Sequence, residues 1–182
     1  MSTEPKTFLT PEQYLEAERK AESKSEYCNG EMFPMDRAGL DTTDMAGARE
    51  IHGDLIWNFG GGLRGQLRSG NCRGISNEMR VLVSATGLYT CPDTVVACGQ
   101  RVLSRSTEAY GRGRKFEQYR SMPSLRQCVP VSSDRMNVDW FTRQPGAPWL
   151  CASVGKPEEL ITLDSIGCRV RLADLYEGVE LA

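Results

Sequence analysis

Histidine is almost absent from this chain: His52 is the only one among 182 residues. The seven cysteines are scattered, and none forms a C-x-x-C pair. Because structural zinc sites need four cysteine or histidine ligands, usually in closely spaced pairs, a zinc site is not expected. A serine–histidine–acid triad is disfavoured as well, since the chain has no G-x-S-x-G turn for the nucleophile. We expect the cysteines to be small, mostly buried thiols.

Long apolar runs are missing too. No stretch approaches the length that spans a membrane, and the first six residues lack the apolar core of a signal peptide. We therefore expect a cytoplasmic protein. The net charge of −2 gives the whole chain no attraction to nucleic acid, so a surface that binds DNA would have to be a local basic patch.

The length fits one domain, residues 1–182, with a substantial core. A capping hydroxyl at Thr10, followed by Pro11, predicts a helix that runs to about Ser23. Apolar residues at helical spacing predict a second helix over residues 48–68, with a kink at the glycine run 60–62. A third helix is expected over residues 107–120, and a loop over residues 36–44.

Several stretches have the alternation that is typical of strands. Asn29-Gly30 predicts a tight hairpin, and a short turn at residues 85–87 predicts antiparallel pairing of strands 77–83 and 88–98. Pro130 indicates that the strand around it lies at an edge or a bulge. The remaining short elements are strands at 127–132, 137–142, 161–163 and 168–172, and a helical turn at 172–176. The order of elements predicts a mixed α/β domain.

Asp93 is the acid whose setting is least expected. It follows Pro92 and precedes the apolar run Thr94-Val95-Val96-Ala97, where a buried carboxylate needs a hydrogen bond, a counter-charge or a cation. Mg²⁺ is bound through one or two carboxylates together with substrate phosphate and water. From the residues alone two interpretations stay open, which are a turn aspartate at a strand edge and a ligand of a hard cation.

Several stretches, taken together, resemble a known family. They include a Thr-Pro-Glu-Gln helix start, a Glu-Tyr-Cys-Asn-Gly-Glu hairpin and a Cys-Pro-Asp-Thr-Val-Val strand. The chain is similar over nearly its whole length to the Uma family of restriction endonucleases, a branch of the PD-(D/E)XK nuclease superfamily. The stretches that carry the resemblance are residues 8–15, 25–33, 89–96, 102–110, 115–120, 166–168 and 172–176.

The resemblance implies a restriction-endonuclease-like α/β fold, with a central mixed sheet flanked by helices. It also implies that two acids hold a divalent ion, Mg²⁺ or Mn²⁺, which activates water and offsets the charge of the scissile phosphate of double-stranded DNA. By position, the first acid and metal ligand is Asp93, the assisting lysine is Lys115, the early acid is Glu31 and the histidine opening the second helix is His52.

The second acid of the family pattern is replaced. Arg101 stands where a glutamate is expected, and the strand before it is shortened. A guanidinium cannot ligate a metal and repels one nearby. Glu78 or Glu108 is an alternative source of the missing carboxylate, and we list Glu78 as a candidate metal ligand. These departures predict impaired cleavage.

A local basic segment surrounds this position in an otherwise acidic chain. Its candidate DNA-binding residues are Arg101, Arg105, Arg112 and Arg114, with a solvated helix face as the alternative interpretation. The three tryptophans, Trp57, Trp140 and Trp149, are expected to pack in the core or at its rim, not to stack on bases.

Three hypotheses remain open: a metal-dependent endonuclease, a nuclease fold that binds DNA or a second copy of itself without cutting, and a remnant without activity. A homodimer is expected if both strands are cut.

Overall fold

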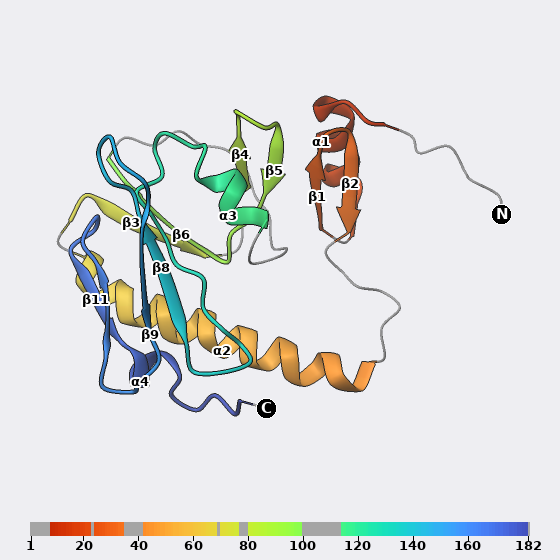
Figure 1. Cartoon of the computed structure of the whole chain (residues 1–182). Coiled ribbons are helices and arrows are strands. Elements are labelled where there is room, and N and C mark those ends of the chain that lie inside the picture. Colours follow the sequence, from red (N-terminus) through yellow and green to blue (C-terminus); the bar gives the residue numbers. More distant parts are fainter. Residues whose placement is uncertain are drawn as a thin grey trace. The chain divides into compact units, whose positions relative to one another are not determined.

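The computed structural model describes residues 8–22, 24–34, 42–68, 70–76, 80–99 and 114–181, without the side chains of residues 42–49, 76, 114 and 115. The described elements are four helices and eleven strands (Figure 1). The strands form four sheets, and every pairing among the described strands is antiparallel. The chain is thus mixed α/β, as the sequence predicts, while a single central mixed sheet stays a prediction.

The chain divides into two compact units, each built from separate segments. Unit 1 is Met1–Ala38, Asn77–Asp93 and Leu103–Pro123, and unit 2 is Gly39–Ser76, Thr94–Val102 and Ser124–Ala182. Since the chain passes back and forth between them, neither unit is a continuous piece of sequence. The expectation of one domain over residues 1–182 stays a prediction.

Unit 1 contains two helices and a four-stranded sheet in the order β2-β1-β5-β4. Its helices are α1 (Pro11–Lys20) and α3 (Arg114–Tyr119), and its strands are β1 (Ser25–Cys28), β2 (Glu31–Pro34), β4 (Val81–Val83) and β5 (Leu88–Thr90). The predicted start of α1 is confirmed, because Thr10 and Gln13 form a reciprocal capping box with Pro11 in the first turn. The helix ends three residues before the predicted end.

The predicted hairpin is confirmed. Asn29 and Gly30 both have positive φ, 51° and 87°, which the tight turn between β1 and β2 requires. A side chain at Gly30 would also collide with the ring of Phe8, 2.8 Å from the position of an added Cβ. The main chain before α1 is tied to the same turn by a hydrogen bond from the Leu9 amide to the Gly30 carbonyl.

The predicted pairing of strands 77–83 and 88–98 is correct for β4 and β5, and residues 77–79 lie outside the described residues. The second strand is not continuous, however. It stops at Thr90, and β6 (Thr94–Cys98) pairs instead with β3 (Cys72–Ser76), a strand that the sequence analysis missed. Pro92 has no amide hydrogen to donate to a ladder, so the strand breaks there and changes partner.

Unit 2 is organised around α2 (Thr42–Leu67), the long orange-to-yellow helix of Figure 1. The predicted helix over residues 48–68 is confirmed and begins earlier, so that residues 42–44 are helical where a loop was expected. Residues 36–41 are outside the described ranges. The helix continues through the glycine run 60–62, because contacts on its buried face outweigh the low helix propensity of glycine, and the predicted kink there stays a prediction.

The remaining strands of unit 2 form a three-stranded sheet, a two-stranded sheet and the β3–β6 pair. Pro130 follows a two-residue strand, and only an isolated bridge at Val131 continues it, which agrees with the predicted edge or bulge. β9 was not predicted. The elements are β7 (Gln127–Cys128), β8 (Val138–Thr142), β9 (Leu150–Val154), β10 (Leu160–Leu163), β11 (Cys168–Arg171) and the helical turn α4 (Leu172–Leu175).

An apolar core holds unit 2 together. Leu63, Val138, Ile161 and Leu172 are almost completely buried in it. Polar side chains of α2 bind the neighbouring main chain: the Asn58 amide nitrogen donates to the carbonyls of Leu175 and Glu177, at 3.0 and 2.9 Å. The buried side of the helix is therefore fixed against the chain's carboxyl-terminal elements.

Two expectations about single residue types are wrong. Cys72 and Cys98 form a disulfide, because the unforeseen β3–β6 pairing places them opposite each other. Of the free cysteines, Cys91 and Cys168 are buried, Cys28 and Cys128 are intermediate and Cys151 is exposed.

Trp57 does not pack in the core or at its rim, since 80% of its surface is exposed on α2. Trp149 is partly covered, with the Arg143 guanidinium 4.5 Å above its ring.

Candidate functional site

Asp93 lies in the bend that follows β5 in unit 1. Thr90 and Cys91, which lead into the bend, are completely buried, while Pro92 and Asp93 are half-buried. The bend exists because the proline interrupts the ladder after Thr90. Asp93 therefore sits directly after a firmly packed strand end.

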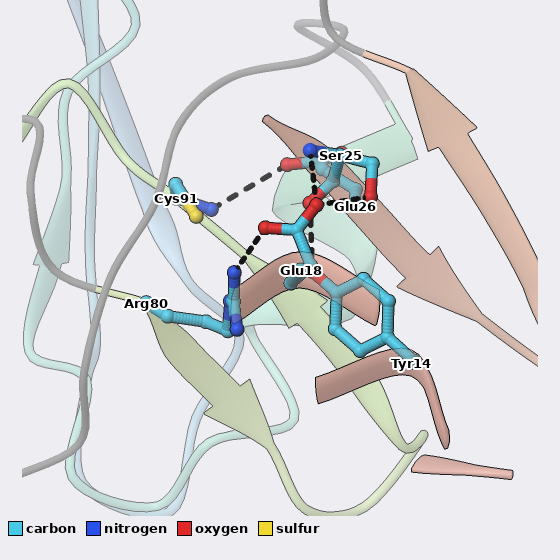
Figure 2. A network of polar contacts seen from close by, with 6 residues as sticks. All are labelled: Tyr14, Glu18, Ser25, Glu26, Arg80 and Cys91. Atoms are coloured by element: carbon cyan, nitrogen blue, oxygen red, sulfur yellow. Dashed lines mark hydrogen bonds and ion pairs between the residues drawn. The ribbon is translucent and has the colours of Figure 1, made fainter. Parts of the chain in front are cut away.

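A buried carboxylate holds this strand end from the neighbouring strand. Glu26 on β1 is only 5% exposed. Its Oε1 accepts a hydrogen bond from the Thr90 hydroxyl at 2.6 Å and one from the Cys91 amide at 3.4 Å. Figure 2 shows Glu26 facing the Cys91 nitrogen across the two strands. Because charge-assisted hydrogen bonds are stronger than neutral ones, Glu26 fixes the backbone two residues before Asp93.

The same strand end is bonded to the helix that carries Lys115. The hydroxyls of Thr90 and Tyr119 lie 3.0 Å apart and share a hydrogen bond. Lys115 precedes Tyr119 by four residues in α3, which is about one helical turn. A chain of hydrogen bonds through Glu26, Thr90 and Tyr119 thus joins the segments of Asp93 and Lys115.

A buried ion pair lies beside this chain of contacts (Figure 2). The Glu18 carboxylate of α1 accepts from the Arg80 guanidinium, and the two side chains are 5% and 8% exposed. Glu18 also accepts from the amide and the hydroxyl of Ser25, the amide at 2.7 Å. Each charge is therefore paired with a buried charge of opposite sign, although the Nε of Arg80 is buried without a hydrogen-bond acceptor among the described residues.

Tyr14 completes this arrangement. Its hydroxyl donates to the Ser25 carbonyl at 2.7 Å, and the Arg80 guanidinium lies 5.0 Å from the centre of its ring. Burial raises the pKa of Tyr14 well above its usual range, with Arg80 opposing the shift. Its ring also stacks on Tyr27, with centroids 4.9 Å apart. Tyr14 is therefore a neutral hydrogen-bond donor that links α1 to β1.

The other predicted site residues are distributed over the chain. Glu31 begins β2, is half-buried and pairs with Cys28 across the hairpin. Burial, together with the charges of Glu26 and Glu31, raises the pKa of the Cys28 thiol. His52 is half-buried on α2, in unit 2. Arg114 begins α3, and the side chains of Arg114 and Lys115 are not described. Glu78, Arg101, Arg105 and Arg112 lie outside the described residues.

A divalent ion finds no complete ligand set in the described part of the chain. No three His, Cys, Asp or Glu side chains gather there as a candidate metal site. Two buried carboxylates of unit 1 already accept from protein donors, Glu26 from Thr90 and Cys91, and Glu18 from Arg80 and Ser25. Both carboxylates are therefore engaged in holding the protein together.

Three residues of this arrangement were missed by the sequence analysis: Glu18, Glu26 and Arg80. Glu31 was chosen as the early acid, five positions after Glu26. All of β1 except its last residue is buried, so the strand lacks the alternation that would mark Glu26 as an inward-facing charge. Arg80 gave a usable signal, since it directly precedes the apolar strand Val81-Leu82-Val83.

No helix of the described residues is long and apolar enough to cross a membrane.

A family model described as "Uma2: Putative restriction endonuclease" matches residues 11–173. Two similar proteins come from Synechocystis sp. (strain ATCC 27184 / PCC 6803 / Kazusa), and both are named only as uncharacterized. The first, slr1290, is 28% identical over 94% of this chain and 93% of its own length. The second, sll1609, is 24% identical over 79% of this chain and 85% of its own length.

Proposed function

This chain belongs to the Uma2 family, described as "Putative restriction endonuclease", and on that premise we propose that it binds double-stranded DNA while its metal-dependent cleavage is impaired. The family supports a nuclease function and DNA as the substrate. The finer parts of the proposal are a restriction-endonuclease-like core with a central sheet, Mg²⁺ or Mn²⁺ as the ion, Asp93 as its remaining ligand and Lys115 as the assisting cation. A homodimer and a cytoplasmic location belong to the same proposal.

The observation that carries the proposal is the state of the buried carboxylates in unit 1. Glu26 and Glu18 both stabilise the protein itself, the first by holding a strand end and the second by neutralising Arg80. An ion at Asp93 would have to compete with these donors for either of them. Mg²⁺ gives up its water reluctantly, so it competes poorly for carboxylates that are already engaged.

Arg101 adds to this argument from the sequence. It occupies the position where the family pattern has its second acid. A guanidinium about 4 Å from a divalent cation is repelled by several kcal/mol at the effective dielectric constant usual in proteins. The same positive charge is well suited to a phosphate of the DNA backbone. The substitution therefore shifts the balance from cleavage toward binding.

A second candidate function is an active endonuclease, and one observation favours it. The Asp93 strand end and the Lys115 helix are tied by the Thr90–Tyr119 hydrogen bond, so the segments that carry the acid and the lysine of the family remain connected. Glu78 or Glu108 would then provide the second carboxylate.

A plasmid-nicking assay in Mg²⁺ and in Mn²⁺, run beside fluorescence anisotropy with a labelled duplex, separates the two functions. We expect salt-dependent binding of the duplex and little nicking. Arg101→Glu should weaken binding and increase nicking. Robust metal-dependent nicking that disappears in Asp93→Ala would overturn the impairment and establish the second candidate. Absence of duplex binding at low salt would overturn the proposal as a whole.

A further inference from the structure

The exposed side of α2 in unit 2 carries an unusual set of residues. Trp57, Gly61 and Arg64 follow one another at intervals of four and three positions, which places them on one face of α2, and Arg68 follows four positions later, directly after the helix ends at Leu67. Every one of them is exposed, Trp57 by 80%. We call this set the α2 stripe. A tryptophan is large and apolar, so its exposure on the same face as an arginine makes this face a candidate for contact with a partner.

The opposite side of α2 fixes the direction in which the stripe points. Leu63 and Leu67 are buried in the core of unit 2, and an added Cβ at Gly62 would lie 3.5 Å from Val170 of β11. The Gln66 side chain donates to the Arg169 carbonyl at 2.7 Å and accepts from the Arg169 amide at 2.9 Å. Because this face is held by both packing and hydrogen bonds, the stripe faces away from the core of unit 2.

The charged residues of the stripe, Arg64 and Arg68, are both positive. From Leu55 to Asn77 the sequence contains arginines but neither aspartate nor glutamate. Gly61 lies between Trp57 and Arg64, and a side chain there would meet nothing within 4 Å. Packing inside the unit therefore does not require the glycine. Because Gly61 has no side chain, a partner can approach the helix backbone at this position.

We infer that the α2 stripe is a second DNA-contacting surface, in which Arg64 and Arg68 bind phosphates of one strand and the Trp57 ring packs against the adjoining sugar. This inference rests on the proposed function, since it needs a chain that binds duplex DNA. It adds residues that are separate in the sequence from the basic segment of Arg101 and Arg105. Guanidinium groups and an aromatic ring on one helix face are suited to a polyanion with apolar sugar edges.

Two other roles for these residues make different predictions. Arg64 lies in the last turn of α2, where a positive charge offsets the helix dipole, so the arginines could serve stability alone. An exposed tryptophan could also meet a second copy of the chain. The charge of the stripe favours DNA, because a second copy of the stripe would bring further arginines and no acidic residue to pair with them, whereas DNA is a polyanion.

Duplex binding by Arg64→Ala/Arg68→Ala, measured by anisotropy over a range of salt concentrations, tests the inference. Each lost phosphate contact lowers the slope of log affinity against log salt by about 0.9, so the double variant should lose about 2 in slope and about tenfold in affinity at low salt. Arg126→Ala/Lys156→Ala removes two exposed charges elsewhere in unit 2 and should change the slope far less. Arg64→Lys/Arg68→Lys should restore most of the slope.

Gly61→Glu tests the same surface without threatening the fold. Glutamate is a better helix former than glycine and meets no neighbour at this position, so the variant should be at least as stable as the wild type. Its carboxylate lies in the centre of the stripe and should weaken duplex binding about tenfold. Ala147→Glu, at an exposed turn in the same unit, has the same net charge and should bind as the wild type does.

The outcomes separate this inference from the proposed function. If the wild type binds no duplex, the proposed function fails and the inference with it. If the wild type binds, Arg101→Ala/Arg105→Ala weakens binding, and the α2 variants leave affinity and slope unchanged, only the inference fails. A loss of stability without a loss of affinity in Arg64→Ala/Arg68→Ala would assign the arginines to the helix dipole. A concentration-dependent dimer in sedimentation that Trp57→Ala abolishes, with DNA binding intact, would assign the stripe to a second copy.

Discussion

The two units bury different kinds of residue. Among the described residues, the buried polar and charged ones belong to unit 1, namely Ser25, Glu26, Arg80 and Thr90. The core cluster of unit 2 consists of aliphatic residues with Cys168 and Tyr176. Apolar packing depends on area and volume, whereas a buried charge depends on the direction and presence of each partner. Unit 2 therefore has the properties of a scaffold, and unit 1 those of a site whose geometry is specified by hydrogen bonds.

The largest effect is expected from breaking the ion pair of unit 1. Arg80→Ala leaves the Glu18 carboxylate buried without its counter-charge, which typically costs about 3–5 kcal/mol of the free energy of unfolding. Urea denaturation measures the loss. Lys20→Ala breaks the exposed Lys20–Glu16 pair and should cost less than about 0.5 kcal/mol. A loss below about 1 kcal/mol in Arg80→Ala would mean that the pair is not buried in solution.

The matching change in unit 2 removes apolar volume. Ile161 is fully buried, so Ile161→Ala should lower the free energy of unfolding by about 3 kcal/mol through lost burial and the remaining cavity. Its neighbour Leu160 is 46% exposed, and Leu160→Ala should cost less than about 1 kcal/mol. The loss in Ile161→Ala should not vary between low and high salt, because it involves no charge. A strong salt dependence would contradict its assignment to apolar burial.

A smaller effect in unit 1 tests the strand end before Asp93. Glu26→Ala removes the acceptor of the Thr90 hydroxyl and the Cys91 amide and should cost about 2 kcal/mol. Glu26→Gln keeps an acceptor oxygen and should cost clearly less. Thermal unfolding compares the two, and hydrogen exchange of the Cys91 amide locates the change. Equal losses in both variants would show that the charge matters more than the hydrogen bonds.

The smallest effect is expected at two glycines, and it has opposite signs in the two units. Gly61→Ala in α2 meets no neighbour and should stabilise the protein by about 0.5–1 kcal/mol. Gly30→Ala should destabilise it by about 1–2 kcal/mol, because the residue has a φ of +87° and its new Cβ would clash with Phe8. The melting temperatures of the two variants should move in opposite directions. A stabilising Gly30→Ala would contradict the hairpin geometry.

Local rules predicted the elements whose cause lies within a few residues. The cap at Thr10, the turn at Asn29-Gly30 and the amphipathic helix that became α2 all depend on neighbours along the chain, and the structure has each of them. The break at Pro92 follows equally local chemistry and could have been predicted from the missing amide hydrogen. The partner that β6 takes after the break could not, because β3 lies about twenty residues earlier and has no clear alternation.

The roles predicted for the site residues stay predictions. Asp93 and Lys115 came from the resemblance, and the structure ties their segments through Thr90 and Tyr119. Glu26 was missed because its burial comes from strand β5, which is more than sixty residues away in the chain. A glutamate in a short strand next to a hairpin gives no sign that a remote hydroxyl and amide will bind it.

By itself, the sequence determined the family, the mixed α/β class, and the position of the cap at Thr10 and the turn at Asn29-Gly30. These depend on which residue stands where, so they can be read along the chain. Only the tertiary structure decided that Glu18 and Glu26 are engaged in protein contacts, that Cys72 meets Cys98, and that Trp57 is exposed beside two arginines. The physical reason is that the burial of a side chain and the identity of its bonding partners depend on segments from distant parts of the chain. A local sequence pattern does not indicate which distant segments will meet.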